Sequence, residues 1–222
     1  MDKFISIKKR YKKIILLKDE DNKPLLIKHL NVFTGIECNR FYNHFLKIDW
    51  KTQQVKIVGR WVNQARQTFA YSKDGKSYTY SGLTIVPTLY DDTINLIQTK
   101  IKEFCNQECD YYLCNRYDNI KNYIGEHSDD ESDLDKNASI ISISLGQTRR
   151  FVIKIPKHKA TKFPRRPVIV VDMNHGDIIE MCCGFQSRYT HSVPKITKLE
   201  QKNRTHQYRI NLTGRVLKIK SS

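Results

Sequence analysis

A histidine and an aspartate two residues apart are the residues of this chain whose types and spacing point most directly to chemistry. They are His127 and Asp129. On an extended strand the side chains alternate between the two faces, so residues i and i+2 project together. An imidazole and a carboxylate placed in this way form two corners of a metal site, and His191 is a candidate for the third. Two histidines and one carboxylate suit non-haem Fe(II), although the same spacing also occurs at solvated strand edges.

A second pattern lies in residues 208–215, which read Y-R-I-N-L-T-G-R. As a strand, this stretch places Arg209, Asn211, Thr213 and Arg215 on one face. Two arginines with hydrogen-bonding side chains between them suit a small anion with more than one carboxylate, because a guanidinium binds a carboxylate through two parallel hydrogen bonds. An ordinary edge strand with a solvated polar face is the alternative. The pattern follows a candidate metal histidine closely, and the two together are much rarer than either alone.

The ordered set of motifs resembles the AlkB-type 2-oxoglutarate/Fe(II) dioxygenases, and is most similar to the eukaryotic branch that repairs alkylated DNA. The resemblance runs from roughly Phe33 to Arg215. It is carried by N-R-Y at 115–117, H-x-D-D-E-x-x-L at 127–134, T-H-S-V-P at 190–194, R-x-N-x-T-x-R at 209–215 and Y-T-Y-S-G at 78–82. No single motif is specific, but the order of all five is.

The resemblance implies that His127, Asp129 and His191 bind Fe(II). It also implies that Arg209 pairs with the distal carboxylate of the cosubstrate 2-oxoglutarate. The full set of cosubstrate-binding residues that it implies is Asn115, Tyr117, Arg209, Asn211, Thr213 and Arg215. In such enzymes oxidative decarboxylation of 2-oxoglutarate to succinate and CO2 drives hydroxylation of an N-methyl group, which then leaves as formaldehyde. His175 is a rival for His191, but its His-Gly-Asp context indicates a turn.

Residues that bind the nucleic acid are also implied by resemblance. A flipped base needs flat aromatic surfaces and a few hydrogen bonds on its edge. Tyr78, Tyr80 and Ser81 occupy the base-pocket position, although an aromatic strand that packs into the core is the more common fate of such a stretch. Asp130 follows the ligand aspartate and, in relatives, helps to orient the damaged base.

A hairpin just before this region is expected to contact the nucleic acid backbone. Arg60 and Arg66 are candidate phosphate contacts, although Ala65 replaces the proline that usually precedes the second arginine. Val58 stands where some relatives carry an aromatic finger that fills the gap left by a flipped base. Valine covers less area and has no π-face, so we expect faster repair of single-stranded than of duplex DNA.

The charge balance supports a polyanionic partner. Lys and Arg number 39 and Asp and Glu 23, which gives a net charge of +16 in 222 residues, and nucleic acid is the first candidate. A codon bias towards Lys, Asn and Ile is the alternative. The basic cluster at 8–13 is either a nuclear-localisation signal, a phosphate-contacting arm or the solvated side of a strand.

The chain shows no apolar run of membrane-spanning length and no signal-peptide pattern. We therefore expect an intracellular monomer, in the nucleus or the cytoplasm, without a membrane partner. In that compartment the six cysteines should be reduced. A zinc site made by Cys105, Cys109 and Cys114 is disfavoured, because their spacing is loose and no C-x2-C pair accompanies them.

The elements that must position these residues are mainly strands. Thr34 and Glu37 form a capping box that opens a helix, and Asp91 and Asp92 open a second one at the positive end of its dipole. Evenly spaced short strands follow from Tyr111, which indicates a sandwich or jelly roll. We predict a mainly β protein with flanking helices (α+β), with the double-stranded β-helix fold that the resemblance implies, as one structural domain. Its parts are a basic N-terminal extension (1–30), a helical support with a nucleotide-recognition lid (31–110) and the catalytic core (111–222).

Three functions remain open at this point. The favoured one is direct repair of 1-methyladenine and 3-methylcytosine in alkylated DNA. A second keeps the enzyme class but acts on methylated RNA. The third is a basic jelly roll that binds nucleic acid without turnover, against which the metal triad and the two arginines argue.

Overall fold

The chain folds around two antiparallel sheets that face each other. The computed structural model describes residues 10–57, 59–80, 83–156, 168–197 and 205–218, with the backbone alone at 56, 57 and 78–80. Within these ranges the larger sheet has nine strands. In spatial order they are β1 (Lys12–Lys18), β2 (Pro24–Leu30), β13 (Ile178–Met181), β10 (Ile140–Gly146), β15 (Arg209–Arg215), β8 (Tyr111–Tyr117), β4 (Arg60–Ser72) and β3 (Lys51–Ile57), with β7 (Thr88–Leu89) parallel to β4.

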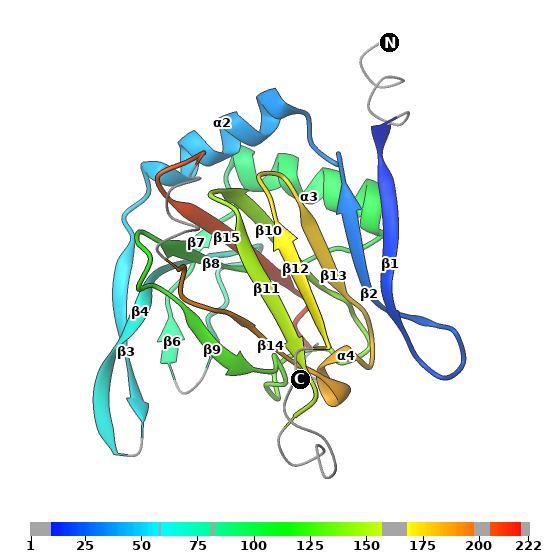
Figure 1. Cartoon of the computed structure of the whole chain (residues 1–222). Coiled ribbons are helices and arrows are strands. Elements are labelled where there is room, and N and C mark those ends of the chain that lie inside the picture. Colours follow the sequence, from blue (N-terminus) through cyan, green and yellow to red (C-terminus); the bar gives the residue numbers. More distant parts are fainter. Residues whose placement is uncertain (1–9, 58, 81–82, 157–167, 198–204, 219–222) are drawn as a thin grey trace.

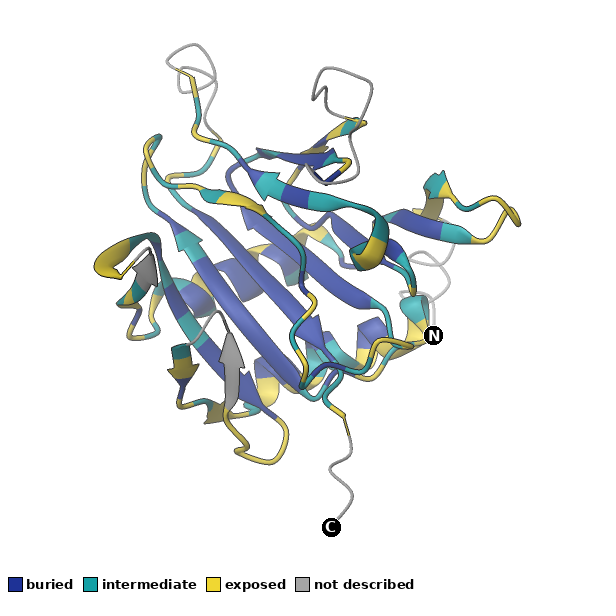
Figure 2. Ribbon diagram, turned by 90° about the horizontal axis from the view of Figure 1, so that it is seen from below, coloured by how far each residue is buried: buried dark blue, intermediate teal, exposed yellow. Residues whose placement is uncertain are grey.

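The smaller sheet covers one face of the larger one (Figures 1 and 2). Its strands are, in order, β12 (Ile169–Met173), β11 (Arg149–Lys154), β14 (Thr190–Val193) and β9 (Ile124–His127). A separate pair is formed by β5 (Tyr78–Tyr80) and β6 (Leu83–Ile85). Two facing antiparallel sheets are the architecture of a jelly roll, so the predicted fold class is confirmed.

Two helices cover the opposite face of the larger sheet (Figure 1). They are α2 (Gly35–Leu46) and α3 (Asp92–Cys105), and a short helix α4 (Phe185–Arg188) precedes β14. The predicted capping box of α2 is present, since the Thr34 N–H donates to Glu37 Oε2 (2.7 Å) and the Glu37 N–H donates to Thr34 Oγ1 (3.2 Å). Asp91 caps α3 by accepting from the Ile94 N–H at 2.9 Å.

Strand alternation explains why β15 has one apolar face, beneath the helices, and one polar face, towards the smaller sheet. In β15, Ile210 and Leu212 join the core beneath α2 and α3. Arg209 and Asn211 therefore point the other way, towards the smaller sheet. The same alternation holds in β13, where Ile178 lies in the helix-side core and the next residue in the core between the sheets. The polar face of β15 is thus enclosed between two sheets.

The N-terminal segment is part of the larger sheet. We expected residues 1–30 to form a basic extension, but β2 pairs with β13 in the register Ile179 to Lys28. Leu25 and Leu26 are buried in the core between the sheets. The apolar residues of 24–30 are what bring this segment into the fold, because their burial outweighs the solvation of its lysines.

Candidate metal and cosubstrate site

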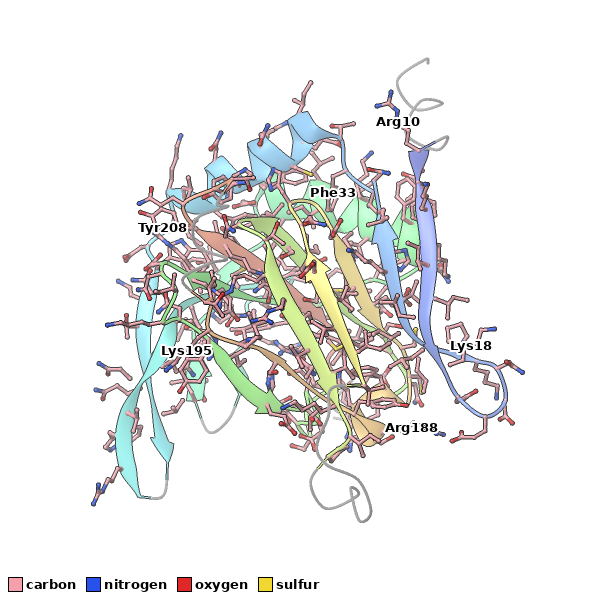
Figure 3. All side chains as sticks on the ribbon, in the orientation of Figure 1. Arg10, Lys18, Phe33, Arg188, Lys195 and Tyr208 are labelled. Atoms are coloured by element: carbon pink, nitrogen blue, oxygen red, sulfur yellow. The ribbon has the colours of Figure 1, made fainter. Side chains whose placement is uncertain are left out.

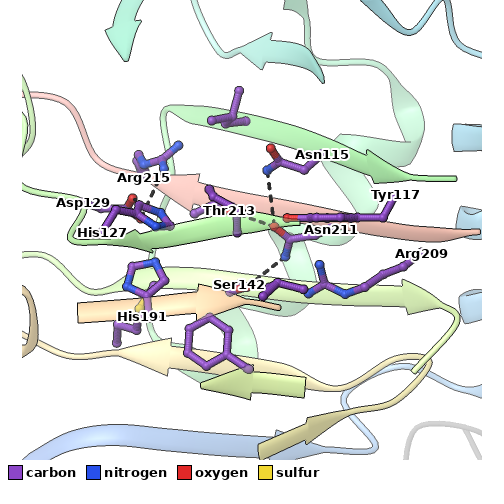
Figure 4. Close-up of a pocket in the computed structure, with 15 residues that line it drawn as sticks. Asn115, Tyr117, His127, Asp129, Ser142, His191, Arg209, Asn211, Thr213 and Arg215 are labelled. Atoms are coloured by element: carbon purple, nitrogen blue, oxygen red, sulfur yellow. Dashed lines mark hydrogen bonds and ion pairs between the residues drawn. The ribbon is translucent and has the colours of Figure 1, made fainter. Parts of the chain in front are cut away.

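A pocket opens between the two sheets, and the candidate residues of the sequence gather in it (Figure 4). Its floor is the polar face of β15 and β8, and its roof is β9 and β14 of the smaller sheet. The residues that line it are Leu113, Asn115, Tyr117, Ile124, His127, Asp129, Ser142, Phe151, Met181, His191, Val193, Arg209, Asn211, Thr213 and Arg215.

The three predicted metal ligands converge at one end of the pocket. His127 and His191 are cross-strand partners in β9 and β14, with ring centroids 4.3 Å apart. The candidate ligand atoms of these histidines and Asp129 all lie within 4.8 Å of one another. Two imidazoles and one carboxylate so arranged form the set that suits Fe(II).

The strand that carries His127 is shorter than expected. We predicted that His127 and Asp129 share a face of one strand, but β9 ends at His127. Asp129 instead lies in the loop that follows, held by a hydrogen bond from its backbone N–H to Gln186 Oε1 (3.0 Å). Its carboxylate still reaches the histidines, with Oδ1 3.5 Å from His127 Nε2. The loop and α4 position this ligand, not strand alternation.

Hydrogen bonding and burial prepare these groups for a metal. Nδ1 of His127 lies 2.8 Å from the carbonyl oxygen of Gly125. A proton held on Nδ1 by that carbonyl leaves the Nε2 lone pair for a metal. Burial lowers the pKa of His191 to about 3, so its imidazole is neutral. A neutral imidazole is the form that binds a metal.

A buried ion pair supports the carboxylate. Nη2 of Arg215 lies 3.2 Å from Asp129 Oδ2, and both side chains are almost fully buried. Burial alone raises the pKa of Asp129, but Arg215 and His127 together lower it well below its usual range. The carboxylate is therefore ionised. Arg215, which the resemblance assigned to the cosubstrate, also lines the pocket, where it forms an ion pair with Asp129.

Arg209 lies towards the other end of the pocket as a buried cation. It is 1% exposed, and its Nε donates to Ser144 Oγ at 3.0 Å. Its guanidinium carbon is 5.1 Å from the centre of the Tyr117 ring. Among the described residues, Arg209 Nη1 has no hydrogen-bond partner. A buried, unpaired N–H of a cation is costly, so this atom fits a site for an anionic group such as a carboxylate of 2-oxoglutarate.

Asn211 holds the floor of the pocket together. Its amide nitrogen donates to Ser142 Oγ and to the Ile143 carbonyl, both at 2.9 Å. Its oxygen accepts from Thr213 Oγ1 at 3.1 Å and from Asn115 Nδ2 at 3.4 Å. Both hydrogens of the amide are therefore used within the protein, so Asn211 positions its neighbours in the pocket.

Arg66 does not lie where a phosphate contact would. It is 7% exposed, and its Nε donates to Asn115 Oδ1 at 2.6 Å. β4 pairs with β8 next to this asparagine, with Asn115 opposite Thr68, so the strand carries the arginine into the sheet. This position favours a role within the sheet over the expected phosphate contact, because the side chain is buried. Through Asn115, which lines the pocket, Arg66 joins the hydrogen-bond chain of Asn211.

Of the remaining substrate candidates, the two whose side chains the structure describes, Arg60 and Asp130, do not line the pocket. Arg60 is exposed at the start of β4 and Asp130 is exposed beside the ligand aspartate. Tyr78 and Tyr80 belong to β5, where the backbone alone is described. Val58 and Ser81 lie outside the described residues.

Two serines of β10 were missed by the sequence reasoning. Ser142 and Ser144 hydrogen-bond to Asn211 and Arg209 respectively. Their alternation with isoleucines in the I-I-S-I-S-L run marks a strand with one polar face, and that signal was present in the sequence. What the sequence did not show is that β10 pairs with β15. The rival histidine, His175, lies in the predicted turn and accepts from the Gly146 N–H at 2.8 Å.

The sequence of the chain is similar to those of known oxygenases. The profile of the 2OG-Fe(II) oxygenase superfamily matches residues 35–215. Over 164 residues the chain is 32% identical to the DNA oxidative demethylase ALKBH2 of Mus musculus and to that of Homo sapiens. The matched residues are 73% of this chain, 66% of the mouse protein and 60% of the human protein. The chain thus spans about two thirds or less of the length of these relatives.

Two further proteins are similar at a lower level. The alpha-ketoglutarate-dependent dioxygenase alkB homolog 3 of Homo sapiens is 29% identical over 199 residues, which covers 83% of this chain and 68% of that protein. The solved structure of OsALKBH1 superimposes with a TM-score of 0.55 at 18% identity, over 87% of this chain and 97% of that chain. The latter likeness concerns the fold alone.

Proposed function

Because the chain belongs to the 2OG-Fe(II) oxygenase superfamily, within its AlkB-type members, we propose that it is an oxidative demethylase of DNA that acts on 1-methyladenine and 3-methylcytosine. Fe(II) and 2-oxoglutarate are the cofactor and cosubstrate of this superfamily. The observation that carries the proposal is the presence, in one pocket, of the His127, Asp129 and His191 triad and of Arg209, whose Nη1 has no hydrogen-bond partner among the described residues. Similarity to the ALKBH2 proteins, which are DNA oxidative demethylases, supports DNA as the substrate.

The residues of the pocket divide the work of such a reaction. His127, Asp129 and His191 would hold Fe(II), with Arg215 keeping the aspartate ionised and in place. Arg209 would hold a carboxylate of 2-oxoglutarate through Nη1, while Ser144 fixes the direction of its guanidinium. Bound in this way, Fe(II) and 2-oxoglutarate would supply the oxidising chemistry, and the protein would supply their ligation and orientation.

The apolar walls exclude water from this chemistry. Phe151, Met181 and Val193 line the same pocket as Arg209 and the metal ligands. The ring of Phe151 stacks on His191, with centroids 5.2 Å apart, so it also limits the tilt of that ligand. A dry pocket strengthens the attraction between Arg209 and an anion, because few water molecules screen it.

The substrate class rests on charge and on exposed cations near the pocket. The net charge of +16 favours a polyanion. Lys195 is exposed and lies over the ring of Tyr123, with Nζ 5.0 Å from its centre. Tyr123 directly precedes Ile124, which lines the pocket. An exposed aromatic ring with a cation over it is suited to a nucleotide strand.

A paired assay on DNA and RNA tests the proposal. The protein is incubated with Fe(II), 2-oxoglutarate and matched oligomers that carry one 3-methylcytosine, and succinate and formaldehyde are both measured. We expect equal yields of the two products, faster on DNA, and none with the Asp129→Ala variant. Faster turnover on RNA would make it an RNA demethylase. Binding of the oligomers without any succinate would make it a nucleic-acid-binding jelly roll.

A further inference from the structure

A second group of metal-binding side chains lies on the helix side of the larger sheet. It consists of His29 on β2, Glu180 on β13 and Cys105, the last residue of α3. Their candidate ligand atoms all lie within 4.8 Å of one another. Glu180 shares the helix-side face of β13 with Ile178, whereas Met181 on the opposite face lines the iron pocket. The two clusters are therefore on opposite faces of the same sheet.

In one of the two tautomers of His29, its hydrogen bonds leave a gap between two acceptors. The hydroxyl of Tyr11 donates to the Phe104 carbonyl at 3.4 Å and lies 2.8 Å from Nδ1 of His29. When the hydroxyl proton is used in this way, Nδ1 carries the proton of the imidazole and donates it to the tyrosine. The lone pair of Nε2 then faces Glu180 Oε2 at 2.9 Å. Two acceptors at this distance require a proton or a metal cation between them.

The carboxylate is prepared in a similar way. Ser139 Oγ donates to Glu180 Oε1 at 2.9 Å. Burial raises the pKa of Glu180, but its close contacts with His29 and Ser139 outweigh burial and lower that pKa. Each of the two side chains thus has a hydroxyl on the atom that would not bind the metal: Tyr11 contacts Nδ1 of His29, and Ser139 donates to Oε1 of Glu180. Hydrogen bonds of this kind orient the ligands of protein metal sites.

Sulfur completes the donor set. Cys105 is a free thiol at the carboxyl end of α3, where the helix dipole favours a cation. Burial raises the pKa of Cys105, so without a metal it is a thiol, and a bound dication would release its proton. Cys182 is a candidate fourth donor. Burial raises its pKa to about 12, and it also interacts with Ser139 and Glu180.

We propose that His29, Cys105 and Glu180 form a structural site for a thiophilic divalent cation, of which Zn²⁺ is the best example. Zn²⁺ combines thiolate, imidazole and carboxylate in four-coordinate sites. The alternative is that the Tyr11 hydroxyl donates to His29 Nδ1 and that His29 Nε2–H donates to Glu180, with the cysteine taking no part. A bound metal would tie β2, β13 and α3 together, and so fasten the N-terminal hairpin to the sheet.

Cobalt substitution distinguishes this site from the iron site, because of the two ligand sets only this one includes a thiolate. Metal-free protein is titrated with Co²⁺, and the near-ultraviolet thiolate-to-cobalt absorption is followed. We expect the band in wild type and in the Asp129→Ala variant, which lacks an iron-site ligand. Cys105→Ser should lose the band, whereas the exposed Cys183→Ser should keep it. Absence of the band from wild type, or its loss in Cys183→Ser alone, would overturn the proposal.

Thermal unfolding with Zn²⁺ gives a second readout that does not depend on the thiol spectrum. All proteins in this test carry Asp129→Ala, because an intact iron site would also bind Zn²⁺. In that background Zn²⁺ should raise the melting temperature of the parent and of Cys183→Ser, but not of Glu180→Gln. Tyr11→Phe keeps all the ligands and removes only the hydroxyl behind His29, so it should weaken Zn²⁺ binding by about 10- to 100-fold. Equal stabilisation of Glu180→Gln and the parent would show that the metal binds elsewhere.

Discussion

Replacing Arg209 with methionine separates its role in binding the cosubstrate from its role in folding. Methionine fills much of the volume of arginine with an apolar chain that can pack against the Tyr117 ring. It also removes a buried cation whose Nη1 has no hydrogen-bond partner among the described residues. Replacing a poorly paired buried charge with an apolar group of similar size is often neutral or stabilising. We therefore expect the melting temperature of the cosubstrate-free variant to stay near that of wild type.

Instead, the Arg209→Met replacement should weaken the binding of 2-oxoglutarate. Removing one partner of a buried charged hydrogen bond costs about 2–5 kcal/mol. At ~1.4 kcal/mol per factor of ten, the apparent KM for 2-oxoglutarate should rise by about 30-fold to several thousand-fold. Burial places Arg209 towards the upper part of this range, because it is 1% exposed and water cannot replace it.

Two measurements check this expectation. Initial rates of succinate formation are recorded against 2-oxoglutarate concentration with saturating Fe(II) and oligomer. In parallel, the rise in melting temperature on adding 2-oxoglutarate is recorded, since a ligand stabilises only a protein that binds it. Arg116→Met is the matched control. It lies on β8 beside Tyr117, but its guanidinium contacts Asp118 and Tyr208 and it does not line the pocket.

The reasoning about Arg209 is refuted by a variant that folds as wild type does and keeps its KM. A KM that rises equally in Arg116→Met would point to a general electrostatic effect of losing one cation. A fall in melting temperature with an unchanged KM would make Arg209 a structural residue.

The other predictions concern the metal, the nucleic acid and the fold. His191→Ala should lose Fe(II) binding in a titration, whereas His175→Ala should keep it; the reverse result would mean that the wrong histidine was assigned. The logarithm of DNA affinity should fall with the logarithm of salt concentration with a slope near −0.9 per phosphate contact. Replacing Lys12 and Lys13 with glutamine should make that slope shallower by about one to two contacts, and an unchanged slope would place these lysines outside the interface. Thr34→Ala removes the cap of α2 and should cost about 1 kcal/mol in the free energy of unfolding measured with urea, and no loss would indicate that Glu37 alone maintains the helix end.

The β3–β4 hairpin forms one edge of the larger sheet. Figure 3 shows long side chains along this hairpin. Trp61 and Val62 of this hairpin are exposed. Within the described residues, no helix has both the length and the apolar character to cross a membrane.

Strand alternation is a local property, and for that reason the sequence alone determined much of this protein. Arg209 and Asn211 had to share a face of their strand because the side-chain period of a strand is two, whatever the strand pairs with. The caps at Thr34 and Asp91 are equally local, since each is completed within three residues. The order of the motifs then placed the chain in its superfamily without any coordinates.

Only the tertiary structure decided which distant residues meet. Arg66 bonds to Asn115 of the pocket because β4 lies next to β8, a pairing that no local pattern encodes. Cys105 pointed to no metal site in the sequence, since its neighbouring cysteines have the wrong spacing. The fold brings it to His29 and Glu180, which are 151 residues apart in the chain. Sheet order depends on the burial of whole faces, and therefore on the entire chain at once.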